Sequence, residues 1–306
     1  MKNQRGGTLV ELMIASLLGL MLSAVILSTL YAAMKSNALK TSAESMQENS
    51  SLALFFLAND LRSIGFAGCY EQGISNLSNH SKGPVSQFLA EFSIISGNTL
   101  AYKNSDSISF VTVLNAGVDT VADMSTVHSR VDLIKNKWIE EQQELLITDC
   151  THADIFTVSD IWRYQLSHEM PSNSSANLSH SYKQGALVYP LSLISYYLAK
   201  GASGRTGLYR KINNKNGHEI IPNVEMLIIR YGVRSAVNQR VRYYAADQHF
   251  DSEQVVSVQL QLLLSSHNQV LDVAMQYQDL HNNTVQADDL RLYKVFNLDI
   301  TLRNRG

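Results

Sequence analysis

The sequence predicts an α+β protein in which one long N-terminal helix packs on an antiparallel β-sheet domain. Three features of the 306-residue chain lead to this prediction. A long apolar run lies near the N-terminus, and apolar residues at helical spacing follow it. The chain then changes to segments in which apolar and polar residues alternate. With 45% hydrophobic and 17% charged residues, the chain beyond the helix is large enough for one sizeable domain.

The apolar run predicts a membrane-spanning helix. Residues 12–33 contain no charged residue, Pro, Asn or Gln, and such a run can cross a hydrocarbon core of about 30 Å. The short basic N-terminus, with Lys2 and Arg5, favours the cytoplasmic side for this end and the outside for residues 34–306. A secretory signal peptide is the alternative, but no small-residue cleavage site follows Ala33 promptly.

The same helix is expected to continue beyond the membrane. No Gly or Pro lies between Gly19 and Gly65, so nothing interrupts a helix from about Leu12 to Ser63. In its second half, residues spaced by three and four positions form one stripe that can pack on a domain. The stripe consists of Leu39, Ala43, Met46, Ser50, Ala53, Leu57, Leu61 and Ile64.

The N-terminal motif resembles a known family. The stretch "RGGTLVELMIA" is similar to the class III signal of type IV prepilins, in which a basic leader ends in Gly and Thr, Leu, a β-branched residue and Glu follow the first mature residue. The resemblance implies that a prepilin peptidase cleaves between Gly6 and Gly7 and that the new N-terminus is methylated. Gly7 departs from the family here, because the first mature residue is usually Phe or another apolar residue.

Glu11 is the one carboxylate at the start of the apolar run. An ionised carboxylate beside hydrocarbon costs several kcal/mol unless another group neutralises it. In the prepilin family the N-terminal amine of one subunit is thought to pair with this glutamate of a neighbour, so the resemblance implies an assembly role for Glu11. The alternative is that Glu11 lies at the interfacial end of the helix, where the helix dipole favours a negative charge.

The resemblance also implies a domain organisation and a location. Residues 1–6 would be the leader, 7–34 the transmembrane half of the helix, 35–65 its amphipathic half, and 66–306 a β-rich globular domain. The protein would be a single-pass inner-membrane protein with this domain in the periplasm, and assembly into the pilus is a further expectation.

The two cysteines, Cys69 and Cys150, both lie on the predicted external side, where disulfides persist. We expect them to pair. Closing a loop of roughly 80 residues would contribute about 4 kcal/mol on the chain-entropy model. Two free buried thiols are the alternative, and no spacing of Cys and His suggests a metal site.

Beyond the helix, six segments have the alternating pattern of strands, separated by segments rich in turn-forming residues. The pattern is clearest between 255 and 266, where Val and Leu alternate with polar residues. The predicted strands are 105–115, 144–150, 153–159, 223–233, 255–266 and 296–305. The predicted surface loops are 76–84, 170–185, 200–207 and 213–217.

Five stretches along the chain narrow the resemblance to the PilW family of minor pilins. Major pilins usually carry a helix-breaking Pro within the apolar segment, whereas the region around Ser28 has none, which fits a low-abundance subunit. The stretches similar to this family are 51–69, 145–159, 208–214, 220–233 and 302–305.

Sequence motifs give no indication of catalysis or of a cofactor. The nine histidines are scattered; His152 lies two residues before Asp154, but no HExxH, GxSxG, Walker or Rossmann pattern occurs. Asp288 and Asp289 lack the spaced oxygen ligands of a calcium loop, which favours a solvated turn. We therefore expect no enzyme activity, no cofactor and no metal.

Charge argues against nucleic-acid binding. The formal net charge is −2 and the pI is about 6.5, so the chain has no overall basic field. Arg210, Lys211 and Lys215 form one small basic patch around a predicted hairpin turn. Contact with DNA is one interpretation of this patch, but charges at hairpin tips mostly serve solubility, and nucleic acid is not an expected partner.

The resemblance implies a minor pilin that takes part in the assembly of type IV pili at the inner membrane, with a place at the pilus tip as a further option. A minor pseudopilin of a type II secretion system is the alternative, and a signal-anchored periplasmic binding module or enzyme with an unprocessed N-terminus is a third. The implied partners are other minor pilins, the major pilin, the prepilin peptidase, the inner-membrane assembly platform, a tip adhesin and inner-membrane lipid.

Overall fold

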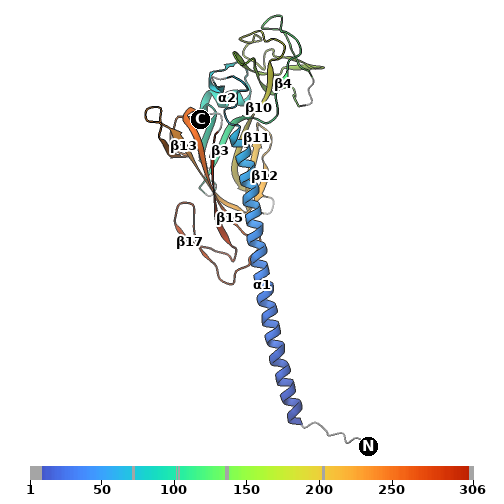
Figure 1. Cartoon of the computed structure of the whole chain (residues 1–306), viewed down its shortest axis with the longest axis vertical. Helices are drawn as coiled ribbons and strands as arrows, with labels where there is room; N and C mark the ends of the chain where they lie inside the picture. Colours follow the sequence, from blue (N-terminus) through green and yellow to red (C-terminus); the bar gives the residue numbers. More distant parts are fainter. Residues whose placement is uncertain are drawn as a thin grey trace, which may run out of the picture.

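A computed structural model describes residues 9–70, 73–100, 102, 104–134, 138–201 and 204–302. Its N-terminal helix α1 runs from Leu9 to Arg62 and projects far beyond a β-rich domain (Figure 1). At 1.5 Å per residue, its 54 residues extend over about 81 Å. The uninterrupted helix and the α+β class predicted from the sequence are confirmed.

The second half of α1 packs on the domain because its apolar stripe faces the sheets. Met46, Ala53, Leu57 and Leu61 are almost completely buried in the main core. The predicted stripe is confirmed from Met46 onward; before it, Leu39 is half-buried and Ala43 is exposed.

The large sheet lies against this half of the helix. Its strands follow the order β1-β7-β6-β10-β11-β12, while β3 and β4 also pair with β10 and β2 pairs with β3. All of these pairs are antiparallel except β1 with β7. The strands are β1 (Ser78–Asn79), β2 (Ile95–Leu100), β3 (Ser105–Val113), β4 (Val118–Asp119), β6 (Glu144–Thr148), β7 (Ala153–Thr157), β10 (Leu187–Lys200), β11 (Thr206–Ile212) and β12 (His218–Pro222).

Strand β10 organises this sheet because it changes partners along its length. Its first residues, 187–190, pair with β6, residues 191–196 pair with β3, and residues 194–200 pair with β11. Pro190 has no N–H to donate and is the last residue paired with β6. A proline is therefore tolerated inside this long strand where one pairing ends and the next begins.

A second sheet covers the other side of the main core, in the order β14-β13-β15-β18. The carboxylate of Asp106 on β3 joins the two sheets, because it accepts a hydrogen bond of 2.8 Å from the backbone N–H of Ile229 on β13. The strands of this sheet are β13 (Val224–Arg234), β14 (Val241–Ala245), β15 (Val255–Ser265) and β18 (Tyr293–Thr301).

Smaller elements complete the domain. A separate apolar cluster, which includes Val131, Phe156 and Leu166, forms beside a three-stranded sheet in the order β5-β9-β8. The green to yellow-green segments of Figure 1 place this region at the end farthest from the N-terminus. The elements are η1 (Ile74–Asn76), α2 (Pro84–Phe92), β5 (Val131–Asp132), β8 (Asp160–Trp162), β9 (Gln165–Ser167), η2 (Ser252–Gln254), and the hairpin of β16 (Gln276–Gln278) and β17 (Thr284–Gln286).

All six predicted strands are present, as β3, β6, β7, β13, β15 and β18. Helix α2 was not predicted, since its short sequence begins at a Gly-Pro pair typical of a loop. Pro84 instead occupies the first turn, where a missing N–H costs nothing. The carboxylate of Glu144 accepts hydrogen bonds from the N–H groups of Val85 and Ser86 and so caps this helix from β6.

Candidate assembly site

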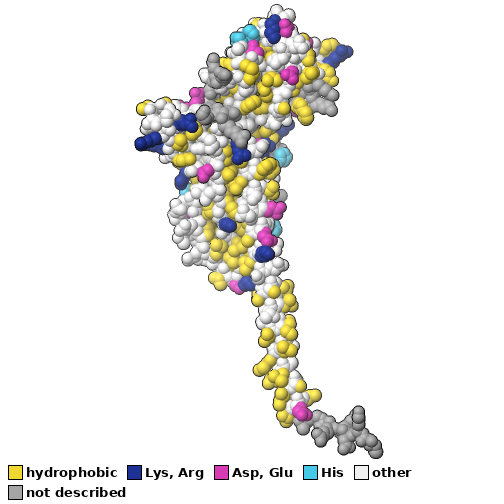
Figure 2. All heavy atoms as spheres, in the orientation of Figure 1, with side chains coloured by type: hydrophobic (Ala, Val, Ile, Leu, Met, Phe, Trp, Pro, Cys, Tyr) yellow, Lys and Arg dark blue, Asp and Glu magenta, His cyan; other side chains and the backbone are white. Residues whose placement is uncertain are grey.

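The first half of α1 is a large exposed apolar surface. Figure 2 shows hydrophobic side chains along the whole projecting part of the helix. Its apolar window has a mean hydropathy of 2.3, and none of that window is buried, so the helix is long and apolar enough to cross a membrane. The exposed large side chains include Leu9, Leu12, Leu17, Met21, Ile26, Leu30 and Met34. Because water is an unfavourable environment for such a surface, lipid or other apolar helices must cover it.

The serine hydroxyl groups in this segment are satisfied within the helix. Ser16 donates to the carbonyl of Met13, Ser23 to that of Gly19, and Ser28 to that of Val25, at 2.8 to 2.9 Å. Such bonds to the preceding turn let a hydroxyl enter an apolar environment without an unpaired donor. These residues are therefore compatible with a membrane-spanning helix.

Glu11 lies in the first turn of α1, exposed at the beginning of the apolar segment. The predicted cleavage site, Gly6 and Gly7, and the rest of the leader 1–6 lie outside the described residues. The two interpretations of Glu11, pairing with a neighbouring subunit and favourable placement at a helix N-terminus, both fit this position. Its assembly role stays a prediction.

An ion pair at the other end of α1 attaches the helix to the large sheet. Asp60 is buried, and its Oδ2 accepts hydrogen bonds from the Tyr196 hydroxyl of β10 at 2.6 Å and from Arg210 Nε of β11 at 2.7 Å. Tyr196 is fully buried, and the side chain of Arg210 is 20% exposed. One carboxylate thus joins the helix to two neighbouring strands.

The charges of this group are fixed by its surroundings. Burial raises the pKa of Tyr196, and the negative charge of Asp60 raises it further, so the phenol remains a neutral donor. Burial lowers the pKa of Arg210, but the hydrogen bond and the charge of Asp60 outweigh it, and the pKa lies above its ordinary value. The guanidinium therefore keeps its charge inside the fold.

Asp60 was not among the residues predicted from the sequence, although its position carries a signal. Asp60 lies three residues after Leu57 and four before Ile64, which places it on the buried stripe. A charge on a buried helical face implies a partner. That partner is Arg210, so the interpretation of Arg210 as a solubility charge at a hairpin tip is wrong. Lys215, in the turn itself, is exposed as expected for a solubility charge.

The acidic pair before β18 requires a similar correction. Asp288 is exposed, as expected for a solvated turn. Asp289 instead accepts hydrogen bonds from the backbone N–H and the Nε of Arg291. The turn is thus held by an ion pair at one of its two acidic residues.

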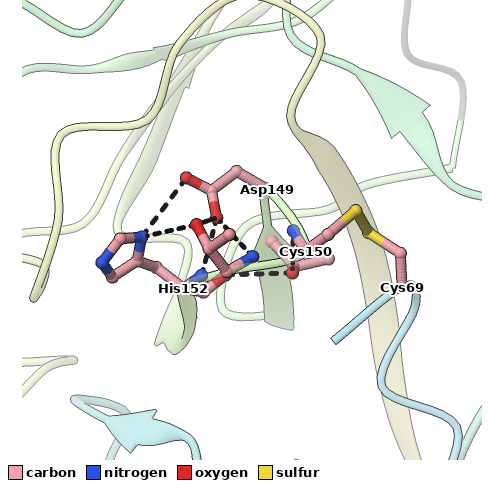
Figure 3. Close-up of a disulfide and its surroundings, with 6 residues drawn as sticks. Cys69, Asp149, Cys150 and His152 are labelled. Atoms are coloured by element: carbon pink, nitrogen blue, oxygen red, sulfur yellow. Dashed lines mark hydrogen bonds and ion pairs between the residues drawn. A yellow bond between two sulfur atoms is a disulfide. The ribbon is translucent and has the colours of Figure 1, made fainter. Parts of the chain in front are cut away.

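The predicted disulfide between Cys69 and Cys150 is confirmed (Figure 3). Cys69 follows α1, and Cys150 lies in the turn between β6 and β7, with a Cα–Cα distance of 4.7 Å. The alternative of two free thiols is wrong, since both cysteines of the chain are joined in this bridge. The bridge ties the end of the long helix to the large sheet.

Asp154, on β7, has a structural role beside this turn. Its fully buried carboxylate binds His80 Nε2 at 2.9 Å and accepts hydrogen bonds from the Tyr182 hydroxyl at 2.7 Å and from the N–H and hydroxyl groups of Ser179. Burial raises its pKa, but these hydrogen bonds outweigh burial, so the pKa lies below its usual range. Asp154 therefore holds the segment around residues 179–182 against β7, whereas His152 has other partners.

Comparison with known proteins identifies the second part of the domain. Residues 195–304 match the family model of type IV pilus-assembly protein W, PilW. The resemblance to the PilW family is thereby confirmed for residues 195–304, whereas the similar stretches 51–69 and 145–159 lie outside the match. The matched region contains Arg210 and the whole second sheet, whereas the long helix precedes it.

The other two comparisons add little to the PilW match. No curated protein sequence matches the chain significantly. One solved structure with a detectable similarity is a type IV-like pilin from Thermus thermophilus, which is 11% identical. The alignment covers 85% of this chain and 98% of the other, with a TM-score of 0.39, and this similarity is too low to support the assignment.

Proposed function

We propose that this protein is a minor pilin that takes part in the assembly of type IV pili at the inner membrane. The main support is one continuous helix whose N-terminal half exposes a predominantly apolar surface and whose C-terminal half packs on the domain that contains the PilW match. The exposed half suits lateral packing with the helices of other pilins, first in the membrane and then in a filament. The prepilin-like motif at residues 5–15 agrees with this function.

The proposed partners follow from the same surface. They are inner-membrane lipid, other minor pilins, the major pilin, the assembly platform, the prepilin peptidase and a tip adhesin. The β-rich domain would lie in the periplasm, where the disulfide can form. In this proposal the protein acts by binding other subunits rather than by catalysis.

A minor pseudopilin of a type II secretion system is the second candidate, because the leader-like motif and the long apolar helix suit both systems. The PilW match favours the pilus. In a strain that lacks the gene, the number of pili sheared from the cells should fall while the export of secreted proteins stays normal. Loss of export with normal piliation would exclude the pilus function.

Glu11 provides a specific test within that strain. Complementation with Glu11→Ala should give few sheared pili and little co-purification of other pilins, because the amine of a neighbouring subunit loses its counter-charge near lipid, a cost of about 3 kcal/mol or more. Membrane insertion should be unaffected, since removal of a charge makes insertion easier. The measurements are a count of sheared pili and recovery of partner pilins after mild solubilisation.

Glu48→Ala is the matched control, because Glu48 is an exposed glutamate on the second half of the same helix. It should restore piliation to the wild-type level. If Glu11→Ala also restored full piliation and full recovery of partners, Glu11 would only favour the start of the helix.

Processing is a further expectation of the proposal. A prepilin peptidase should cleave the bond between Gly6 and Gly7, because the residues Thr8 to Glu11 fix the register of the motif. Intact-mass spectrometry of protein extracted from membranes should give a chain beginning at Gly7, and an added methyl group would be visible in the same spectrum. A mature chain that still begins at Met1 would contradict the pilin function.

A further inference from the structure

Three side chains with metal-binding atoms meet beside the disulfide. They are Asp149 and His152, from the turn between β6 and β7, and His180, from the long connection between β9 and β10. Asp149 Oδ2 lies 3.5 Å from His152 Nδ1 and 3.7 Å from His180 Nε2. One ligand atom from each of the three residues lies within 4.8 Å of the other two.

The carboxylate of Asp149 is oriented by its own turn. Its Oδ1 accepts hydrogen bonds from the N–H groups of Thr151 and His152 and from the Thr151 hydroxyl, at 2.6 to 3.0 Å. With Oδ1 held in this way, the carboxylate presents Oδ2 to the two imidazoles, and Figure 3 shows His152 and Asp149 directed toward each other.

Two fixed points outside the cluster hold its members together. The disulfide of Cys150 anchors the turn between Asp149 and His152. Asp154 anchors Ser179 and Tyr182, which flank His180 in the sequence. The imidazole rings of His152 and His180 consequently stack, with their centroids 3.9 Å apart and an angle of 4° between the planes.

We propose that Asp149, His152 and His180 form a binding site for one divalent transition-metal ion of the zinc class. Imidazole nitrogen and carboxylate oxygen are the ligands that such ions prefer, whereas calcium and magnesium prefer oxygen alone. With ligand bonds of about 2.0 to 2.2 Å, neighbouring ligand atoms of a tetrahedral zinc site lie about 3.4 Å apart. The two separations from Asp149 Oδ2 are close to this value.

Binding requires one adjustment, because an ion must lie in the plane of each ring that binds it and parallel stacked rings do not share a plane. The His152 side chain is 50% exposed, which leaves it room to turn. Its Nδ1 also lies 2.9 Å from the Thr151 hydroxyl, which donates to Asp149, so Nδ1 carries the ring proton in this arrangement. On metal binding the neutral ring must take the other tautomer, with its proton on Nε2, while the hydroxyl keeps its bond to Asp149. Three protein ligands leave at least one position of the ion open to water or to another ligand.

The ion would join two segments that no covalent bond connects directly. It would link the turn, already bound to the end of α1 through Cys150 and Cys69, to the connection between β9 and β10. That connection contains the predicted loop 170–185, which has no regular strand. The expected result of metal binding is therefore a more stable loop at the end of the domain far from the exposed half of α1.

Equilibrium dialysis of the full chain in detergent tests the site. The protein carries no oligohistidine tag and is freed of metal with a chelator. It is then dialysed against zinc at concentrations from about 0.1 to 100 µM, because a partly exposed site with three ligands should have a dissociation constant of roughly 1 µM. We expect one equivalent of zinc to bind. His180→Gln should weaken zinc binding at least tenfold, because the substitution removes one ligand. It leaves the turn that contains Asp149 and His152 unchanged.

His218→Gln is the matched control, because His218 is an exposed histidine on β12, outside the cluster. It should bind zinc as the wild type does. Cobalt(II) provides a second readout, since its visible absorption reports nitrogen and oxygen ligands directly, and this absorption should be lost in His152→Gln and in His180→Gln. Circular dichroism spectra that match the wild type would show that both variants remain folded.

Two results would overturn the proposal. One is the absence of stoichiometric zinc binding to the wild-type chain at 100 µM, a concentration roughly a hundredfold above the expected dissociation constant. The other is zinc binding that His180→Gln and His152→Gln leave unchanged, which would place the ion elsewhere.

Discussion

Asp60→Ala is expected to lower the free energy of unfolding by about 3–5 kcal/mol, because it removes the counter-charge of a largely buried guanidinium. The Arg210 side chain is 20% exposed, and the fully buried Tyr196 hydroxyl would lose its acceptor at the same time. Chemical denaturation of the full chain in detergent, followed by the far-ultraviolet circular dichroism of the sheets, measures this loss.

Two further variants distinguish the loss of the Asp60 charge from the general effect of a substitution at this part of the helix. Asp60→Asn keeps an oxygen acceptor for Tyr196 but removes the charge, so it should cost less than Asp60→Ala. Asn59→Ala changes the exposed neighbouring residue and should stay within about 0.5 kcal/mol of the wild type. A loss below about 1 kcal/mol for Asp60→Ala would show that the ion pair does not hold the helix on the sheet.

Replacing both Cys69 and Cys150 by Ser should lower the free energy of unfolding by about 4 kcal/mol, because the bridge closes a loop with a sequence separation of 81. Both cysteines are changed together, since a single substitution leaves a reactive thiol. The measurement is the same denaturation experiment, with the wild type in reducing and non-reducing buffer as the comparison.

The reduced wild type should unfold at the same denaturant concentration as the double variant. Equal stability of the oxidised wild type and the double variant would contradict the expected contribution of the bridge. A difference between the reduced wild type and the double variant would instead measure the effect of the Ser side chains.

The sequence predicted the parts of the fold that depend on local pattern. The alternation in β15 and the absence of Gly and Pro in most of α1 correspond directly to elements of the structure. The central strand β10 was not predicted, because Pro190 argues against a strand unless its change of partners is known. Partner exchange is a tertiary property and leaves no local pattern.

The candidate sites show the same limit. The disulfide could be predicted because the chain has two cysteines and one possible pair. Asp60 could have been found from its position on the buried stripe, but Arg210 as its partner could not, since strand pairing brings the two together. His180 joins Asp149 and His152 only because Asp154 fixes the segment around it, and no spacing along the chain encodes that contact.

The bridge between Cys69 and Cys150 also determines how mechanical load would travel through the protein. Tension applied to the exposed half of α1 passes along the helix to Cys69 and through the sulfur atoms into the turn between β6 and β7. The residues between the two cysteines, which include α2 and β2 to β4, lie outside this covalent path. A pull on the helix is therefore delivered covalently to the β6–β7 turn of the large sheet, and the ion pair of Asp60 with Arg210 is a second, noncovalent link that shares the load.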